Sequence, residues 1–413
     1  MSDLVPDGWK CSNIGKSMLN VPKKYNAIEG GNPRYIGLEH ISPMMKRLNH
    51  WGYANEVIST KSVFSIGDTL FGKLRPYLEK VSLADFDGIC STDILVIRAK
   101  TGICSEFLYV VMSSEKAIRH SVESSAGNIM PRTSWKYMAE YQFLLPPLPE
   151  QQKIAAILTS VDEVIEKTQA QIDKLKDFKT GMMQELLTKG VGIDGKPHTE
   201  FKDSPVGRIP KEWEVYELGD LASKIEGGGT PSRTEPVFWN GGIPWATVKD
   251  LKEVQLSSTQ EYISPLGLEK SASKLIPANT MIIASRMAVG KAVMFNKDVS
   301  INQDLKAFYP TNNLDSKFLL HWYLSKAKYI EGLGTGSTVK GIRLEDLKLL
   351  VILLPPIEEQ HKIASLLTSI DEVIQAKTRK KEVQKNTKKA LMQDLLTGKV
   401  RVTVPTPSSA KAS

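Results

Sequence analysis

An internal duplication constrains the fold of this chain more than any other feature. Residues 144–190 begin LLPPLPEQQKIAAILTSVDEVI, and residues 353–399 begin LLPPIEEQHKIASLLTSIDEVI. About half of the aligned positions are identical. A shorter pair, VPDGW at 5–9 and IPKEW at 209–213, opens each half. Two units of this size are domains, so stacking of short repeats is excluded.

Each repeated segment is predicted to form one long helix. Pro146-Pro147 and Pro355-Pro356 suit a helix start, and apolar residues then recur at a spacing near 3.5. Such a helix would run ~60 Å at 1.5 Å per residue. One apolar stripe on so long a helix needs a partner, and the duplicate is the obvious one. The alternative is that each helix lies on its own domain. The residues expected to pair the helices are Ile154, Leu158, Val161, Ile165, Ile363, Leu367, Ile370 and Ile374.

The duplication predicts an order of domains along the chain. Residues 1–145 and 210–352 would be two similar bodies, and 146–190 and 353–400 the two helices. Residues 191–209, rich in Gly, Pro and Asp, would be a surface linker, and 401–413 a disordered tail. The expected architecture is therefore two α+β domains separated by a long antiparallel two-helix coiled coil, with pseudo-two-fold internal symmetry.

Short β-type runs recur in both bodies and support the α+β class. YIGLEHI (35–41) stands beside IPWATV (243–248), and DILVIRA (93–99) beside MIIAS (281–285). A helical stretch follows late in each body, at SEFLYVVMSS (105–114) and SKFLLHWYLSK (316–326). This mixture is typical of a mixed or antiparallel sheet with helices on one side.

Composition narrows the functional classes. The 413 residues carry a net charge of +8, a mild excess that favours an anionic partner without proving one. Three cysteines without a CxxC pair fit a reducing compartment and argue against a structural zinc. No apolar run approaches ~20 residues, and the first residues lack a signal-peptide pattern. We expect a cytoplasmic protein with no membrane partner.

A search for catalytic motifs is mostly negative. The chain has no G-x-G-x-x-G, no Walker-type phosphate loop and no H-x-x-x-H pair. GGGTPSR (227–233) is glycine-rich, and a turn explains it better than a phosphate site. No nucleophile elbow supports a Ser-His-Asp triad. We therefore expect no catalytic residue, no metal and no cofactor on this chain.

Basic and polar side chains in loops are the candidates for DNA contact. FGKLRPYLEK (71–80) has Lys73, Arg75 and Tyr77 at alternate positions, which would lie on one face if the stretch is extended, and IIASRMAVGK (282–291) is its counterpart. Arg suits guanine and Asn or Gln suits adenine, whereas Lys, Ser and Thr more often hold phosphates. A solvated surface charge is the alternative for each residue, and a structural turn for Asn302-Gln303. The full set is Lys46, Arg47, Lys73, Arg75, Tyr77, Arg132, Thr230, Ser232, Arg233, Lys249, Arg286, Lys291, Asn302, Gln303, Lys340 and Arg343.

The chain resembles the specificity subunit of type I restriction-modification systems. The resemblance is carried by the two helix motifs, by FKDSPVGRIPKEWEV (201–215) and GGGTPSRTEPVFWNGGIPWATVKDL (227–251), and by VSINQDLKAF (299–308) with GTGSTVKGI (334–342). It covers nearly the whole chain, although the first body lacks the GGTPS and PW elements. The resemblance implies two target-recognition domains, each reading one half of a bipartite site in double-stranded DNA.

The resemblance also implies partners. The paired helices would dock two modification subunits, which bind S-adenosylmethionine and methylate adenine, and separate motor-nuclease subunits would carry out restriction. The chain itself would not be an enzyme. Two other classes remain open from the residues: a catalytic nuclease or methyltransferase with an unrecognised site, and a scaffold that binds only proteins.

Overall fold

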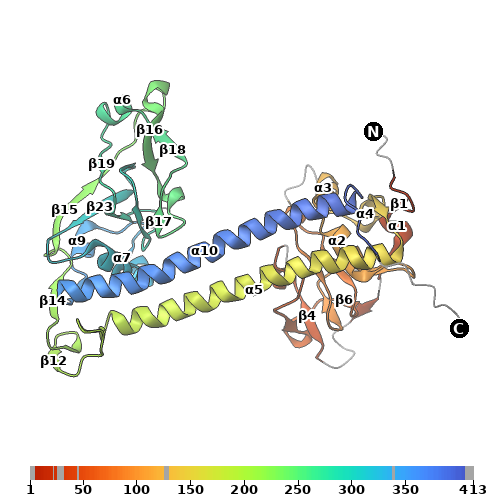
Figure 1. Cartoon of the computed structure of the whole chain (residues 1–413), viewed down its shortest axis with the longest axis horizontal. Coiled ribbons are helices and arrows are strands. Elements are labelled where there is room, and N and C mark those ends of the chain that lie inside the picture. The colour runs from red at the N-terminus through yellow and green to blue at the C-terminus, as the bar shows by residue number, and fades with distance from the viewer. Residues whose placement is uncertain are drawn as a thin grey trace. The chain divides into compact units, whose positions relative to one another are not determined.

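The structure is a computed structural model that describes residues 5–21, 23–25, 32–43, 46–124, 130–336 and 340–404. The chain divides into two compact units, residues 1–171 with 378–413, and residues 172–377. Both boundaries fall inside the long helices α5 (Leu148–Leu186) and α10 (Ile357–Leu396) (Figure 1). Each unit therefore contains one body, the first part of one helix and the last part of the other.

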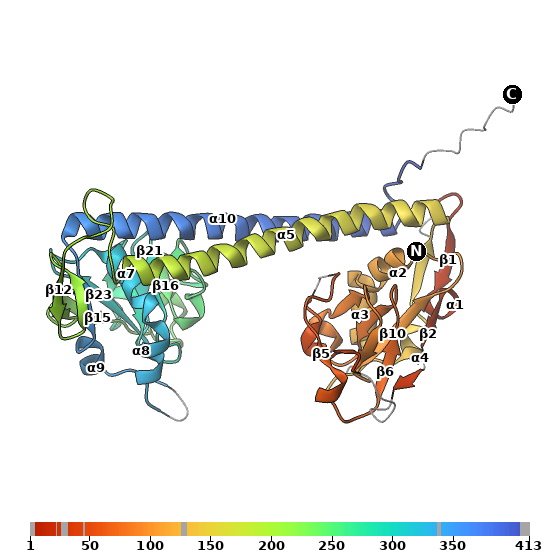
Figure 2. The ribbon, with the colours of Figure 1, turned by 90° about the horizontal axis from the view of Figure 1, so that it is seen from below.

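In the described part of the first unit, the two larger sheets have the strand orders β2-β10-β7-β8 and β3-β6-β9-β4-β5. Helix α2 packs on strands β7, β8 and β10 (Figure 2). The elements of this body are β1 (Lys10–Asn13), α1 (Ile14–Ser17), β2 (Met18–Asn20), β3 (Lys24–Tyr25), β4 (Arg34–Ile36), β5 (Gly52–Tyr53), β6 (Lys61–Phe64), β7 (Thr69–Gly72), η4 (Pro76–Leu78), β8 (Val81–Leu83), β9 (Gly88–Cys90), β10 (Ile94–Ala99), α2 (Ser105–Met112), α3 (Glu115–Glu123), α4 (Trp135–Met138) and β11 (Gln142–Leu145). Strand β1 pairs antiparallel with β11, so the first strand of the body lies beside its last strand, just before α5 begins.

The second unit has the same plan, with sheets in the orders β15-β23-β20-β21-β17 and β18-β16-β22-β19. Helix α7 packs on β20 and β21. Its elements are β14 (Glu214–Glu217), β15 (Ala222–Gly227), η5 (Pro236–Phe238), β16 (Trp239–Ala246), η6 (Val248–Asp250), β17 (Gln255–Leu256), β18 (Glu261–Ile263), α6 (Pro265–Glu269), β19 (Leu275–Ile276), β20 (Met281–Ala284), β21 (Ala292–Phe295), β22 (Val299–Ile301), β23 (Leu305–Pro310), α7 (Ser316–Ser325), α8 (Ala327–Leu333), α9 (Leu344–Lys348) and β24 (Val351–Leu354).

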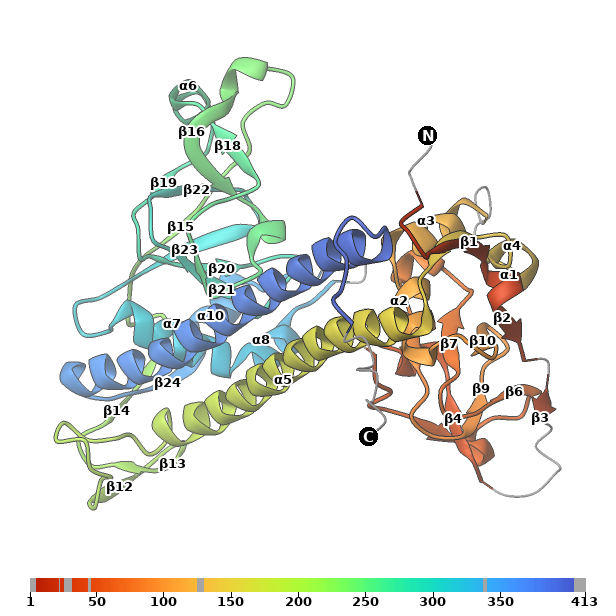
Figure 3. The ribbon, with the colours of Figure 1, turned by 45° about the vertical axis from the view of Figure 1, so that its right-hand side comes forward.

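The two bodies share their strand topology. The parallel pair β4–β9 matches β16–β22, and the antiparallel pair β7–β10 matches β20–β23 (Figure 3). This confirms the mixed-sheet α+β class and the pairing of YIGLEHI with IPWATV. The pairing of DILVIRA with MIIAS was wrong, because DILVIRA forms β10, whose equivalent is β23. Both runs are buried and apolar, so residue type alone does not distinguish neighbouring strands of one sheet.

The segment after α5 differs from the expected surface linker. Strands β12 (Phe201–Ser204) and β13 (Gly207–Pro210) form a hairpin there, with Phe201 opposite Pro210. Pro205 and Val206 form the turn, and Gly207 at the start of β13 allows it with a φ of 108°. The expected tail also begins later than predicted, since Arg401 forms an ion pair with Glu150 at 2.6 Å. Residues 405–413 lie outside the described residues.

The apolar stripe of each helix packs against the other helix and also on its own body, so both alternatives from the sequence apply. Ile154 and Leu158 pack into the core of the first body together with Met392 and Leu395 from the end of α10. Ile363 and Leu367 pack likewise into the second body, beside Leu186 and Leu187. Of the other residues expected in the pairing, Ile165 is buried, and Val161, Ile370 and Ile374 are half-buried. The start of each helix therefore contacts its own body as well as the other helix.

Polar contacts show that the helices run antiparallel. In the first unit, Asp162 meets Lys388 at 2.5 Å and Gln169 meets Lys381 at 2.7 Å. In the second unit, Lys179 meets Asp371 at 2.6 Å. The repeat alignment equates Asp162 with Asp371 and Lys179 with Lys388. The same ion pair therefore occurs once in each unit, with the partners contributed by opposite copies.

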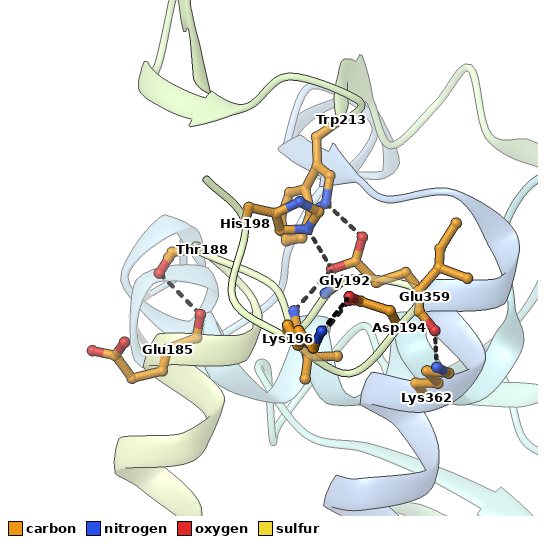
Figure 4. Close-up of polar contacts among 11 residues, drawn as sticks. Glu185, Thr188, Gly192, Asp194, Lys196, His198, Trp213, Glu359 and Lys362 are labelled. Carbon is orange, nitrogen blue, oxygen red and sulfur yellow. Dashed lines mark hydrogen bonds and ion pairs between the residues drawn. The ribbon is translucent and has the colours of Figure 1, made fainter. Parts of the chain in front are cut away.

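A buried glutamate at the start of each long helix joins it to its body. The Trp213 indole donates to Glu359 Oε2 at 2.9 Å, while Oε1 accepts from the backbone of Val191 and Gly192 and from His198 Nε2 (Figure 4). Burial alone would raise the pKa of Glu359, but these hydrogen bonds lower it.

The first unit repeats this arrangement. The Trp9 indole donates to Glu150 at 3.1 Å, and Arg401 supplies two further hydrogen bonds to the same carboxylate. The residue after each glutamate is a glutamine. The Gln151 side chain accepts the N–H of Cys104, just before α2, and the Gln360 side chain accepts the N–H of Asp315, just before α7. The duplicated tryptophan of the opening motif and the duplicated glutamate of the helix motif are therefore direct partners.

Candidate nucleic-acid interface

In the first body, three segments meet where strand β7 ends. The Lys73 N–H donates to the Asp93 carbonyl at 2.9 Å, and the Thr133 N–H donates to the Lys73 carbonyl at 2.9 Å. The Arg75 N–H then donates to the Pro131 carbonyl at 2.7 Å. We call this junction of residues 73–75, Asp93 and 131–133 the first apex.

Charged side chains concentrate at the first apex. Arg132 forms an ion pair with Asp93 at 2.8 Å, while about half of its side chain stays exposed. Burial lowers the pKa of Lys73, Asp93 opposes that shift, and Arg132 adds to it. Arg75 and Tyr77 are exposed in the same loop. The structure thus brings together Lys73, Arg75 and Arg132, as a basic surface for an anionic partner requires, and Tyr77 follows in η4.

The second body builds the same junction from different residues. The Ser285 N–H donates to the Asp304 carbonyl at 2.9 Å, and the Ile342 N–H donates to the Ser285 carbonyl at 3.0 Å. The Met287 N–H donates to the Lys340 carbonyl at 2.8 Å. We call this junction of residues 285–287, Asp304 and 340–342 the second apex.

The backbone match sets the residue equivalence of the two apices. Leu74 bridges Arg132 as Arg286 bridges Gly341, so Arg286 occupies the place of Leu74. Arg286 lies 3.4 Å from Asp304, which repeats the Arg132–Asp93 pair. Arg75 therefore matches Met287 rather than the arginine beside it. The sequence offers no sign of this, because each loop contains one arginine and the two arginines match by residue type.

Three further candidates lie beside the second apex. Asn302 is buried, and it accepts the Asp304 N–H and donates to the Asp304 carboxylate at 3.0 Å. Asn302 therefore adopts the structural turn that was left open as an alternative. Gln303 is exposed and accepts a hydrogen bond from the Thr230 hydroxyl at 2.6 Å.

The glycine-rich loop forms a separate cluster. The Arg233 guanidinium lies 3.8 Å from the Trp239 ring centroid and is hydrogen-bonded to Glu261. Its bond to Arg233 lowers the pKa of Glu261, against the opposing effect of burial. The neighbouring Ser232 hydroxyl bonds to Thr234 at 2.7 Å. Because the charge of Arg233 is neutralised and its plane is stacked, this arginine chiefly orders the loop.

The remaining candidates are dispersed over the two bodies. Arg47 lies 3.9 Å from Glu163 on α5, and the Lys46 carbonyl accepts the Leu83 N–H. Lys249 and Arg343 are exposed, and Lys291 reaches the Leu251 carbonyl at 3.4 Å. None of these contacts places any of the five residues at an apex.

Sequence reasoning missed three residues of the apices. Asp93 and Asp304 each precede an inner strand of a sheet and form ion pairs with the arginines, and Met287 is 61% exposed. The signal for the aspartates was present, since SINQDLKAF and CSTDILVIRA both place Asp directly before a buried strand. Met287 carried no signal, because methionine usually fills cores. Among the described residues, no group of His, Cys, Asp and Glu could hold a metal ion.

Comparison with known proteins assigns the family. The profile of the type I restriction modification DNA specificity domain matches residues 22–177 and 210–385. The putative MjaX specificity subunit of Methanocaldococcus jannaschii is 30% identical over 96% of this chain and 95% of its own. The MjaVIII specificity subunit of the same organism is 28% identical over 96% and 94%. The chain belongs to the family of type I restriction enzyme specificity subunits.

A solved structure shares the fold. The type I restriction-modification S subunit from M. genitalium aligns with a TM-score of 0.58 over 95% of this chain and 97% of that chain, at 12% identity. Within the part of the chain that the structure describes, no helix is long and apolar enough to cross a membrane.

Proposed function

We propose that this chain reads a two-part sequence in double-stranded DNA, with one body for each part. The observation that carries the proposal is the duplicated apex, a single backbone arrangement that occurs once in each body. Each apex presents a fixed frame with exposed basic groups, which position a protein on phosphates. The side chains on the two frames differ, and such differences are what base reading requires.

The two long helices are proposed to dock two modification subunits. Apolar side chains on their surfaces remain exposed, and Val164 (46%) and Val373 (45%) are equivalent positions of the repeat. Phe178 on α5 is 57% exposed. Equivalent apolar positions on two copies of one helix suit two copies of one partner. Restriction motor-nuclease subunits would join the assembly through these partners.

Catalysis is proposed to reside on the partners and not on this chain. Methyl transfer needs S-adenosylmethionine, and we expect it on the modification subunits, with no cofactor on this chain. A cytoplasmic location follows from a DNA target inside the cell. If the purified chain alone transferred methyl groups to DNA, a catalytic function would replace this proposal.

Mapping of methylated adenines tests the proposed function. The chain would be produced in cells together with its modification subunit, and methylated positions in their DNA would be sequenced. We expect one motif with two specified parts and an unspecified spacer of constant length. Methylation at a single uninterrupted motif, or none beyond cells that lack this chain, would contradict the proposal. If the affinity of the chain for DNA did not depend on salt concentration, the result would favour the alternative of a scaffold that binds only proteins.

A further inference from the structure

Two of the residues other than glycine that adopt the left-handed backbone conformation occupy equivalent positions in the two bodies. Arg75 has a φ of 50° and Met287 a φ of 66°. Glycine is the usual occupant of this conformation, because a Cβ atom is strained there. A methionine at such a position is uncommon. Strained residues of this kind cluster at functional sites, so the equivalent positions of Arg75 and Met287 indicate a shared function.

The surrounding backbone imposes this conformation. The N–H of Arg75 is bonded to Pro131, and the N–H of Met287 to Lys340, by the equivalent hydrogen bond. Each bond anchors the main chain of the residue while its side chain stays exposed. A residue anchored in this way presents its side chain in a reproducible direction.

The Met287 side chain is apolar in polar surroundings. The preceding residue, Arg286, forms an ion pair with Asp304, and Lys340, whose carbonyl accepts the Met287 N–H, is exposed. A thioether in such a place adds nothing to the hydrophobic core, and 61% of it remains in contact with solvent. On a DNA-binding surface its natural counterpart is the thymine 5-methyl group, the apolar feature of the major groove.

We propose that Arg75 and Met287 are equivalent base-contacting residues, and that Met287 packs against a thymine methyl group in the half-site of the second body. This inference rests on the proposed function and assigns its specificity residues. Arg75 can donate two hydrogen bonds to guanine, whereas Met287 donates none. The two half-sites therefore differ in sequence at the base that each apex residue contacts.

Selection from random DNA tests the assignment. The full chain, in complex with its modification subunit, is incubated with a pool of duplexes randomised over both half-sites, and bound duplexes are sequenced. Arg75→Met should abolish a guanine preference in one half only. Met287→Arg should replace a thymine preference by guanine in the other half only. Arg208→Met and Val206→Arg, on the hairpin of β12 and β13, are the matched controls and should leave the motif unchanged.

The outcomes separate the inference from the proposed function. A wild-type complex that selects no two-part motif defeats the proposed function itself. A wild-type motif that stays the same in both apex variants leaves the proposed function standing and overturns the inference. A loss of binding that is equal for all sequences would make the apex residues phosphate contacts, and would overturn it as well.

Two further measurements isolate the methyl contact. Replacing the selected thymine by deoxyuridine removes only the methyl group, and we expect binding to weaken by roughly three- to tenfold for wild type and not at all for Met287→Ala. Equal weakening in both proteins would overturn the assignment. Met287→Gly should raise the thermal midpoint by relieving the backbone while it loses the thymine preference. A lowered midpoint with the preference intact would show that Met287 has only a structural role.

Discussion

At the scale of single residues, two buried glutamates join the long helices to their own bodies. Glu150 and Glu359 each bind an indole N–H from the opening motif of their own half. Both side chains lie at the start of a long helix, where the helix dipole also favours negative charge. The orientation of each helix on its body is therefore specified by a few directed hydrogen bonds.

Neutralising Glu359 tests this role. Glu359→Gln keeps the shape but removes the charge that accepts bonds from Val191, Gly192, His198 and Trp213. We expect the free energy of unfolding to fall by about 2 kcal/mol, measured by denaturant titration. Glu358→Gln, at the exposed neighbouring position, is the control and should change it by less than about 0.5 kcal/mol. Equal effects would argue against the network.

His321 gives the second unit a dependence on pH. Burial lowers its pKa to about 3, with Lys179 and Lys317 contributing, and its Nε2 lies 3.1 Å from the Thr368 hydroxyl. The unfolded histidine titrates near its ordinary value of about 6.5. The stabilisation is therefore complete above about pH 6.5 and is lost as the pH falls towards 3.

The pH prediction is a difference between two proteins. Below pH 6.5 the folding equilibrium of wild type should weaken about tenfold per pH unit relative to His321→Gln. Urea titrations at pH 7.5, 6 and 5 would measure it, and comparison with the variant cancels the carboxylates that titrate in both proteins. Parallel pH profiles of the two proteins would refute the assignment.

At the scale of elements, the helix pair is held by apolar ends and buried polar contacts. Asp162 and Lys388 are only 2% and 3% exposed, and Lys179 and Asp371 are 13% and 19% exposed. Burial raises the pKa of both aspartates against the opposing effect of the lysines. Ion pairs of this kind give little net stability over an apolar pair, yet they penalise any arrangement that separates them.

Removing one partner of the buried Asp162–Lys388 pair should lower the free energy of unfolding far more than replacing both partners by apolar residues. Lys388→Met leaves Asp162 buried without its cation, and we expect a loss of about 3–5 kcal/mol in unfolding free energy. The double variant Asp162→Leu with Lys388→Met should recover most of that loss. Lys385→Met removes an exposed pair with Glu382 and serves as the control, with an expected change below about 1 kcal/mol. A double variant no more stable than Lys388→Met would contradict this account.

At the scale of the whole molecule, we propose that helix length sets the spacer between the half-sites. Helix α5 has 39 residues and α10 has 40, which corresponds to ~60 Å at 1.5 Å per residue. One turn of B-DNA is ~34–36 Å, so half-site centres one to one and a half turns apart are expected. The recognition domains would then determine which bases are read and the helices how far apart they are.

Lengthening both helices tests that division. An insertion of four residues in α5 and in α10 adds ~6 Å and keeps the apolar stripe nearly in phase. We expect the methylated motif to retain both half-sites with a longer unspecified spacer. Four residues inserted in the turn between β12 and β13 are the control and should leave the spacer unchanged. An unchanged spacer in the lengthened helices would show that the bodies, not the helices, determine it.

What the sequence determined by itself follows from local rules and from the duplication. Periodic apolar residues and flanking prolines were enough to predict both long helices, because helix formation depends on neighbours three and four residues apart. The repeat was enough to predict two similar α+β bodies. The assignment of Lys73, Arg75, Tyr77 and Arg132 to DNA contact stays a prediction, and the first apex brings Lys73, Arg75 and Arg132 together.

Only the tertiary structure decided which residues are equivalent and which are engaged. Equivalent backbone hydrogen bonds place Arg75 and Met287 at the same position of their two bodies, and side-chain bonds hold Asn302 in its turn and tie Arg233 to Glu261. The Arg401 side chain also pairs with Glu150, 251 residues earlier in the chain. Such contacts depend on how strands and loops meet in space, and no periodicity in the sequence records that meeting.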